Sequence, residues 1–263
     1  MSATKLRRDV GLAAWQVLYE QRSFWRNRAG AFFALVMPLM FLVIFASIFD
    51  GKTIVLGHGH TIPYVTWFIP GILAYGVIGT TFVNIAIVTA VLRDEGVLKR
   101  MAGTPLPRWA YVAGRIGSTA IITLVITVID LGVGRLAYGV HVRSSTLPGL
   151  VVTLALGSAA FTALGVGIVR YITNAEAAPA VVNFAILPLT FISGIWFHMS
   201  LSPTLTDIAK AFPVRALAHG FQYAFNPHTA GSGFESSDLL TLAIWLAVGV
   251  VAMLVFLRKP DRG

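Results

Sequence analysis

The chain has 263 residues, of which 56% are apolar and only 12% are charged, and its mean hydropathy is +0.77. A soluble domain carries about 25% charged residues, so this composition excludes an ordinary soluble enzyme, and the apolar content excludes a disordered chain. With no cysteine, the chain can form no disulfide and no thiolate-bound metal site. The net charge of +9 suggests nucleic acid when taken alone, but in a membrane protein the basic residues mark cytoplasmic loops. We therefore expect an all-α integral membrane protein that binds no nucleic acid.

The N-terminal segment, residues 1–28, is predicted to be an amphipathic helix lying on the cytoplasmic leaflet. Apolar residues recur in it at helical spacing, with Trp15 and Tyr19 as anchors at the membrane interface. Gln16 and Glu20 are assigned to the remaining, polar surface. This segment is not a signal peptide, since the apolar run after it is too long and no cleavage pattern follows.

Six stretches are long and apolar enough to cross a bilayer as helices, which takes about 20 residues each. They cover residues 29–49, 63–92, 116–140, 147–169, 177–197 and 239–257. The second is long enough either to tilt or to contain a break at Pro70-Gly71. No stretch alternates as a membrane barrel strand would. The chain is thus predicted to be one transmembrane domain, residues 1–263, with both termini on the same side.

The basic residues predict the orientation of the chain. Of the 20 Lys and Arg residues, 15 lie before the first span, in the loop 93–115, after the fourth span or after the sixth. Four lie on the opposite side, and Arg135 lies within the third span. Because cytoplasmic loops collect Lys and Arg, both termini are predicted to be cytoplasmic. The interval 198–238 is then the longest outer loop.

The outer loop 198–238 contains apolar residues at helical spacing in two places, which predicts two short amphipathic helices. These residues are Leu205, Ile208, Ala209 and Phe212 in the first, and Leu217, Phe221 and Phe225 in the second. All six histidines fall in predicted outer loops. His58 and His60 could ligate a metal ion, but no nearby carboxylate completes a set, so we expect no metal site.

Asp130 lies well inside the third predicted span, where a charge is costly and normally faces another helix or a wet cavity. Two interpretations stay open for it: a group on a transport route, and a structural hydrogen bond near the outer interface. Arg135 is expected to reach the lipid head groups. Because the spans contain no histidine and one aspartate, catalysis within the membrane is not expected.

Two segments resemble the ABC-2 type permeases, the membrane subunits of ABC exporters. The first is the run from Arg93 to Leu106, where charged residues with Gly and Leu end in Thr-Pro-Leu. The second runs from Leu187-Pro188 to Ser193-Gly194 and continues with Leu201, Pro203 and Phe212-Pro213-Val214. The resemblance covers essentially the whole chain. It implies a fold of six transmembrane helices after the amphipathic one, with short re-entrant helices in the last outer loop.

The resemblance also implies partners. A separate ATP-binding subunit would hold ATP and Mg²⁺ and dock on a coupling helix in the loop 93–115, while this chain itself carries no cofactor. A second permease copy, identical or paralogous, would pair with it in a bacterial plasma membrane. The residues expected to couple to the ATPase are Arg93, Asp94, Glu95, Leu98 and Arg100.

The expected function is ATP-driven export of apolar or amphipathic compounds such as a drug, an antibiotic or a lipid, by a chain that is not itself an enzyme. The almost uncharged spans favour such cargo, and Phe41, Phe45 and Asp130 are candidate residues of the translocation path. Export of a polysaccharide or lipid-linked glycan is an alternative. From another class, a membrane-embedded enzyme or a proton-coupled carrier would use Asp130.

Overall fold

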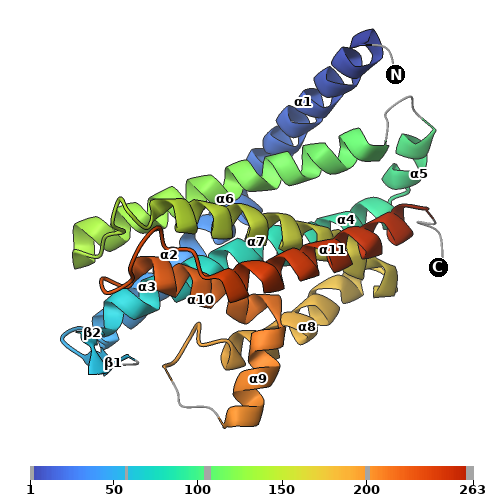
Figure 1. The fold of residues 1–263 in the computed structure, drawn as a ribbon. Coiled ribbons are helices and arrows are strands. Elements are labelled where there is room, and N and C mark those ends of the chain that lie inside the picture. The colour runs from blue at the N-terminus through green and yellow to red at the C-terminus, as the bar shows by residue number, and fades with distance from the viewer. Residues whose placement is uncertain (1–2, 57–58, 104–107, 199–201, 259–263) are drawn as a thin grey trace.

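The computed structural model describes residues 3–56, 59–103, 108–198 and 202–258. About four fifths of these residues are helical, and the helices form one bundle (Figure 1). The elements are α1 (Ala3–Arg26), α2 (Arg28–Ile48), β1 (Thr53–Val55), β2 (Thr61–Pro63), α3 (Tyr64–Ile78), η2 (Gly79–Val83), α4 (Asn84–Asp94), α5 (Val97–Ala102), α6 (Arg108–Tyr138), α7 (Leu147–Ile168), η3 (Val169–Tyr171), η4 (Ala175–Ala177), α8 (Ala178–Ile192), α9 (Pro203–Ala211), α10 (Pro213–Phe225) and α11 (Ser236–Arg258).

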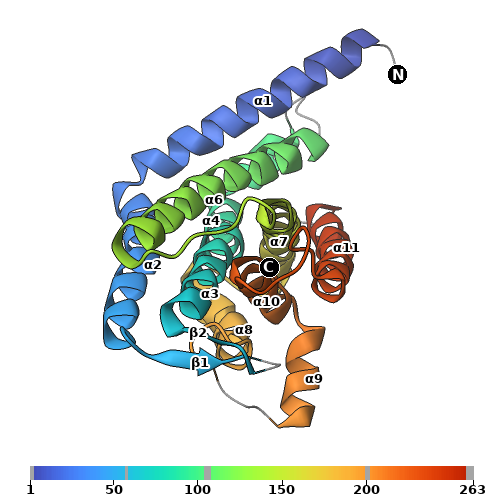
Figure 2. The same cartoon turned by 60° about the vertical axis from the view of Figure 1, so that its left-hand side comes forward.

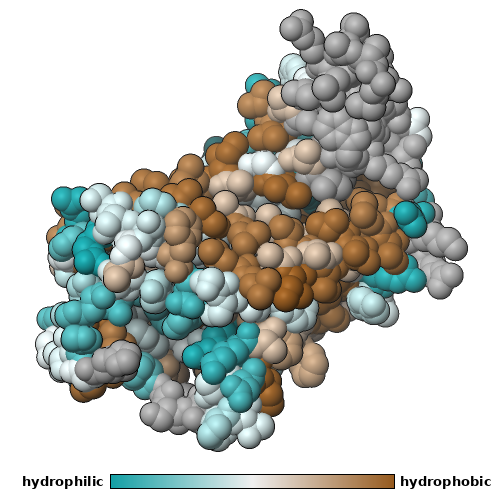
Figure 3. Space-filling model, in the orientation of Figure 1, coloured by the Kyte–Doolittle hydropathy of each residue, from teal (hydrophilic) through white to brown (hydrophobic). Residues whose placement is uncertain are grey.

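The six predicted spans are confirmed, because six helical segments of the described chain are long and apolar enough to cross a membrane. Their bounds are Arg28–Ile48, Tyr64–Asp94, Ala113–Tyr138, Leu147–Tyr171, Ala175–Ile192 and Ser236–Arg258. Apolar side chains cover the middle of the bundle, and polar ones gather toward its ends (Figure 3). Such a band is the surface that a bilayer requires.

The two ends of the bundle differ. The start of α1, the helix α5 and the end of α11 lie at one end, called here the α5 end (Figure 1). The opposite, hairpin end carries β1 and β2, which pair antiparallel with Ile54 opposite Ile62. The first, third and fifth spans therefore run from the α5 end toward the hairpin end, and the second, fourth and sixth spans run back.

The second span contains its irregularity at a different place from Pro70-Gly71. The helix continues through Pro70, and a π-helical turn, η2, follows at Gly79–Val83. Gly165 of α7 lies against this turn so closely that a Cβ atom there would be 2.9 Å from the Phe82 carbonyl oxygen. The close approach of two backbones requires glycine at this crossing. Of the two alternatives, the break at Pro70-Gly71 is absent, because α3 is continuous there, and the distortion lies where α7 crosses.

The fifth span ends as a helix at Ile192, five residues before the expected end at residue 197. Gly194 follows with φ of 82°, which turns the chain out of the helix. The turn packs onto α3, where a Cβ on Gly71 would lie 2.6 Å from the Ile195 carbonyl oxygen. The chain thus leaves the helix and continues along α3, where the His198 ring lies 5.3 Å from that of Trp67 near the hairpin end.

The two short helices expected in the loop 198–238 are confirmed as α9 and α10. Residues 199–201 of that loop, including Leu201, lie outside the described residues. The start of α10 at Pro213 lines the same cavity as Phe82, near the middle of the second span. Its other end reaches the hairpin end, where the Thr146 hydroxyl donates to the Ala224 carbonyl at 2.7 Å. Helix α10 thus runs from mid-depth to the hairpin end, among α3, α7 and α11 (Figure 2), as a re-entrant helix does.

Candidate functional site

The charged end of the second span ties two loops of the α5 end together. The Arg93 guanidinium donates to the carbonyl oxygens of Val169 and Ile172, at 2.9 and 2.8 Å. Asp94 pairs with Arg93 at 2.9 Å and accepts a hydrogen bond from the backbone of Ala175. The Arg93 side chain is only 12% exposed, and its guanidinium holds the turn between α7 and α8 against the end of α4.

The short helix expected as the coupling helix is present as α5. Gly96, with φ of 69°, separates it from α4. Leu98 is buried, whereas Glu95, Lys99 and Arg100 are exposed. Of the predicted coupling residues, Leu98 is buried and Arg93 is bonded to the turn between α7 and α8, whereas Asp94, Glu95 and Arg100 are exposed. Residues 104–107, at the end of the Arg93–Leu106 run, lie outside the described residues.

The N-terminal helix is held to α6 by a buried ion pair. The Arg115 guanidinium contacts the carboxylate of Glu20, with side chains 4% and 12% exposed. Arg115 also donates to the Thr89 hydroxyl of α4 at 3.2 Å, and Gln21 donates to the Ser118 carbonyl at 2.8 Å. These contacts connect α1 with α4 and α6, and hence with the segment that leads into α5.

The assignment of Gln16 and Glu20 to the polar surface of α1 was wrong, because both are partly buried. Both face α6, and a Cβ on Gly114 would meet the Gln16 side chain at 2.3 Å. Trp15 and Tyr19 are 68% and 66% exposed, on the side of α1 turned away from the bundle. Figure 2 shows α1 lying along α6, outside the other spans. The physical reason is that Arg115 lies inside α6, which begins at residue 108, and needs a counter-charge from α1.

Asp130 is fully buried on the face of α6 that packs against α3. Ile126 lies one turn before it and contacts Gly76, and Gly134 lies one turn after it and contacts Ile69. Neither carboxylate oxygen of Asp130 has a hydrogen-bond partner among the described residues. Of the two interpretations, the structure thus gives no hydrogen bond to support the structural one.

Phe41 and Phe45 belong to an aromatic cluster between α2, α3 and the turn after α8. The ring of Phe41 is 5.3 Å from that of Trp196 and 5.9 Å from that of Tyr75. The ring of Phe45 is 5.4 Å from that of Phe68. These rings contact one another rather than Asp130, whose described neighbours are on α3.

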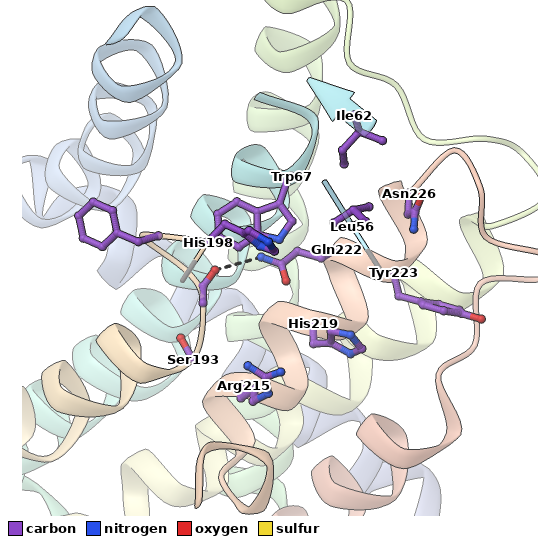
Figure 4. Close-up of a pocket in the computed structure, with 12 residues that line it drawn as sticks. Leu56, Ile62, Trp67, Ser193, His198, Arg215, His219, Gln222, Tyr223 and Asn226 are labelled. Atoms are coloured by element: carbon purple, nitrogen blue, oxygen red, sulfur yellow. Dashed lines mark hydrogen bonds between the residues drawn. The ribbon is translucent and has the colours of Figure 1, made fainter. Parts of the chain in front are cut away.

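Polar side chains that sequence analysis assigned to loops meet in a cavity of about 260 Å³ at the hairpin end. We call it the α10 pocket; its walls are the hairpin, Trp67 of α3, the turn after α8, and one face of α10 with Arg215, His219 and Gln222 (Figure 4). His219 thus lies on a helix rather than in a loop. The helical spacing of these polar residues is the signal that could have revealed the pocket. It places them together on the face of α10 opposite the apolar residues Leu217, Phe221 and Phe225.

The histidines form no metal site in the described part of the chain, where no group of three potential ligands occurs. His219 Nδ1 lies 2.7 Å from an Asp238 carboxylate oxygen. The rings of His60 and His228 stack at 4.1 Å. His58 lies outside the described residues, so the expected absence of a site there stays a prediction.

A second cavity, of about 250 Å³, lies between α7, α8, α10 and α11. Its lining is almost wholly apolar and includes Phe82, Phe161, Leu189 and Trp245. It opens within the apolar middle of the bundle, at the depth where α10 begins. Such a space can accept an apolar group from the membrane.

Comparisons with known proteins agree with this architecture. Residues 15–226 match the family described as ABC-2 type transporter. The chain is also 21% identical over 241 residues to the inner membrane transport permease YadH of Escherichia coli (strain K12), a match that covers 88% of this chain and 90% of YadH. The YadH proteins of Escherichia coli O157:H7 and Shigella flexneri match over the same shares and with the same identity.

Proposed function

The chain belongs to the ABC-2 type transporter family, and from this premise we propose that it is the permease subunit of an ATP-driven exporter of apolar or amphipathic compounds. The observation that carries the proposal is the family match across a bundle of six membrane-spanning helices. The similar YadH is itself named a transport permease. The chain would supply the route, and a separate subunit would bind ATP and Mg²⁺.

The cargo class is supported by the chemistry of the spans. Asp130 is fully buried beside α3, away from the surface of the bundle. Arg115 is neutralised by Glu20. The cavity between α7, α8, α10 and α11 is apolar. Little in the membrane-spanning part would hold a highly charged solute, whereas an apolar body can be accommodated.

The orientation follows from the same proposal. The α5 end carries the basic loops and would face the cytoplasm, with both termini, in a bacterial plasma membrane. Glu95, Lys99 and Arg100 would then meet the ATP-binding subunit. A second permease copy, identical or paralogous, would complete the route. Mixed charge on α5 suits such docking because it fixes orientation as well as affinity.

Co-purification tests this proposal. The tagged full-length chain, extracted from its native membranes in a mild detergent, should bring down an ATP-binding protein with a Walker A loop in near-equal amount. Mass spectrometry identifies the partner, and ATP hydrolysis by the complex measures its activity. A clean preparation that contains no ATP-binding protein would contradict the proposal.

Replacing Asp130 with asparagine separates the exporter from a proton-coupled carrier or a membrane-embedded enzyme. Asparagine has nearly the same shape and no charge, so ATP-driven efflux of an amphipathic fluorescent dye should stay within about twofold of the original rate. The melting temperature should stay equal or rise, since an unpaired buried carboxylate is unfavourable. The exposed Asp207, changed to asparagine, is the control. Complete loss of transport in a folded Asp130→Asn protein would instead favour the carrier or the enzyme.

A further inference from the structure

One face of α10 is polar and only partly open to solvent. Arg215, His219, Gln222, Tyr223 and Asn226 succeed one another at intervals of one to four residues, and none of them is fully exposed. The opposite face of α10 is buried against α3, α7 and α11. The polar face of an amphipathic helix normally meets water. Here it lines the α10 pocket, so these side chains are placed to meet a bound molecule.

Arg215 carries a charge at the deep end of this pocket. It comes two residues after Pro213, which lies beside Phe82 near mid-depth. Among the described residues, its guanidinium has no hydrogen-bond or ion-pair partner. Asp238, which lies nearby in the fold, is already engaged by His219 at 2.7 Å. A half-buried charge is unfavourable until an opposite charge accompanies it.

The rest of the pocket combines a fixed amide with apolar walls. Gln222 Nε2 donates to the Gly194 carbonyl at 3.1 Å, which holds its side chain against the turn after α8 (Figure 4). Trp67 is only 7% exposed and forms one wall. Leu56 and Phe197 also line the space. The pocket therefore offers one positive charge beside aromatic and aliphatic surface.

We propose that the α10 pocket binds the anionic headgroup of an amphiphile, a phosphate or a carboxylate, with Arg215 as the main anion contact. A guanidinium matches both groups through two parallel hydrogen bonds. Trp67 and Leu56 would contact the first apolar atoms beyond the headgroup. The role of this pocket in transport rests on the proposed function. The pocket adds to that function the charge of the compounds that the chain recognises. The same headgroup chemistry occurs in membrane phospholipids and in anionic compounds that an exporter moves.

Binding is measured on the purified full-length chain in phosphatidylcholine nanodiscs, without ATP or a partner, so that its failure would leave the exporter proposal standing. The probe is tetradecyl phosphate, titrated calorimetrically, and tetradecyl maltoside is the neutral comparison. We expect saturable binding of one tetradecyl phosphate per chain and much weaker binding of the maltoside. In Arg215→Met the affinity should fall at least tenfold, because a hydrogen bond to a charged group is lost.

The control is Arg135→Met, which removes the same charge from an exposed position on α6 and should leave the affinity unchanged. If Arg215→Met does not fold, Arg215→Lys keeps the charge but not the paired hydrogen bonds, and its affinity should fall about threefold or more. The proposal would be overturned if tetradecyl phosphate bound the original chain, Arg215→Lys and any folded Arg215→Met with equal affinity. It would also be overturned if tetradecyl maltoside bound as tightly as tetradecyl phosphate.

A second series distinguishes the two sources of the headgroup. The titration is repeated in nanodiscs that contain phosphatidylglycerol. If this lipid lowers the affinity for tetradecyl phosphate in the original chain but not in the Arg215 variants, the pocket is assigned to a membrane lipid. Undiminished binding of tetradecyl phosphate in those nanodiscs would assign it to a single-chain anionic amphiphile. Either result supports an anionic headgroup site at Arg215.

Discussion

Replacing Arg115 with methionine should lower the free energy of unfolding by about 3–5 kcal/mol, the usual effect of removing one partner of a buried ion pair. The change leaves the Glu20 carboxylate, which is 12% exposed, against the apolar surface of α6. It also removes the hydrogen bond from Arg115 to Thr89. Helix α1 should then separate from α6. Thermal unfolding in detergent measures the loss, and proteolysis near Asn27, between α1 and α2, detects the separation.

The double variant Glu20→Gln/Arg115→Met should recover most of that stability, because it leaves no uncompensated charge. Arg135→Met is the matched control: it makes the same change on the same helix at an exposed position, and should alter stability by no more than about 0.5 kcal/mol. If Arg115→Met and Arg135→Met melted at the same temperature, the ion pair would not be what holds α1 in place.

Replacing Glu95 with lysine should abolish most ATP-driven export, by at least tenfold, while the protein stays folded. Glu95 is exposed between α4 and α5, where the proposed ATP-binding subunit would dock. Close charge pairs across an interface contribute about 1.5–7 kcal/mol of coupling, and reversing one charge turns attraction into repulsion. A lysine at the carboxyl end of α4 is favourable for that helix, so stability should not fall. Dye efflux and the recovery of the ATP-binding subunit are measured together.

Asp207→Lys is the control for this charge reversal, since Asp207 is equally exposed but lies on α9, away from the α5 end. It should leave both efflux and subunit recovery unchanged. Unaltered export in Glu95→Lys, with normal recovery of the ATP-binding subunit, would show that α5 is not the docking helix. Loss of export in both variants would indicate a general effect of charge instead.

The spans, α5 and the two short helices α9 and α10 were predictable because each depends on local pattern. About 20 apolar residues must become a helix in a bilayer, whatever their neighbours, since every backbone polar group has to be paired within the segment. The end of α8 was not predictable in this way. The apolar run continues to residue 197, but the helix stops at Ile192 because Gly194 turns the chain. Gly71 on α3 has no side chain and so leaves room for this turn to pack.

The candidate sites also combine features that depend on local sequence with contacts that depend on distant segments. Arg93 and Asp94 were predicted only as charged residues of the loop that would meet the ATPase, but their bonds to Val169, Ile172 and Ala175 join segments about 80 residues apart. Arg115 was counted among the basic residues of a loop, although its partner Glu20 lies 95 residues earlier. A one-dimensional pattern carries no information on which distant helix a polar side chain will face.

By itself, then, the sequence determined that this protein is an all-α membrane chain with six spans, and it located the segment that becomes α5. Those features follow from hydropathy and helical period, which act within one segment. Only the tertiary structure decided that Glu20 pairs with Arg115, that Asp130 faces α3, and that the polar face of α10 lines a pocket. Each of these depends on which helices meet, and close contacts such as that of Gly165 with the Phe82 backbone fix that arrangement.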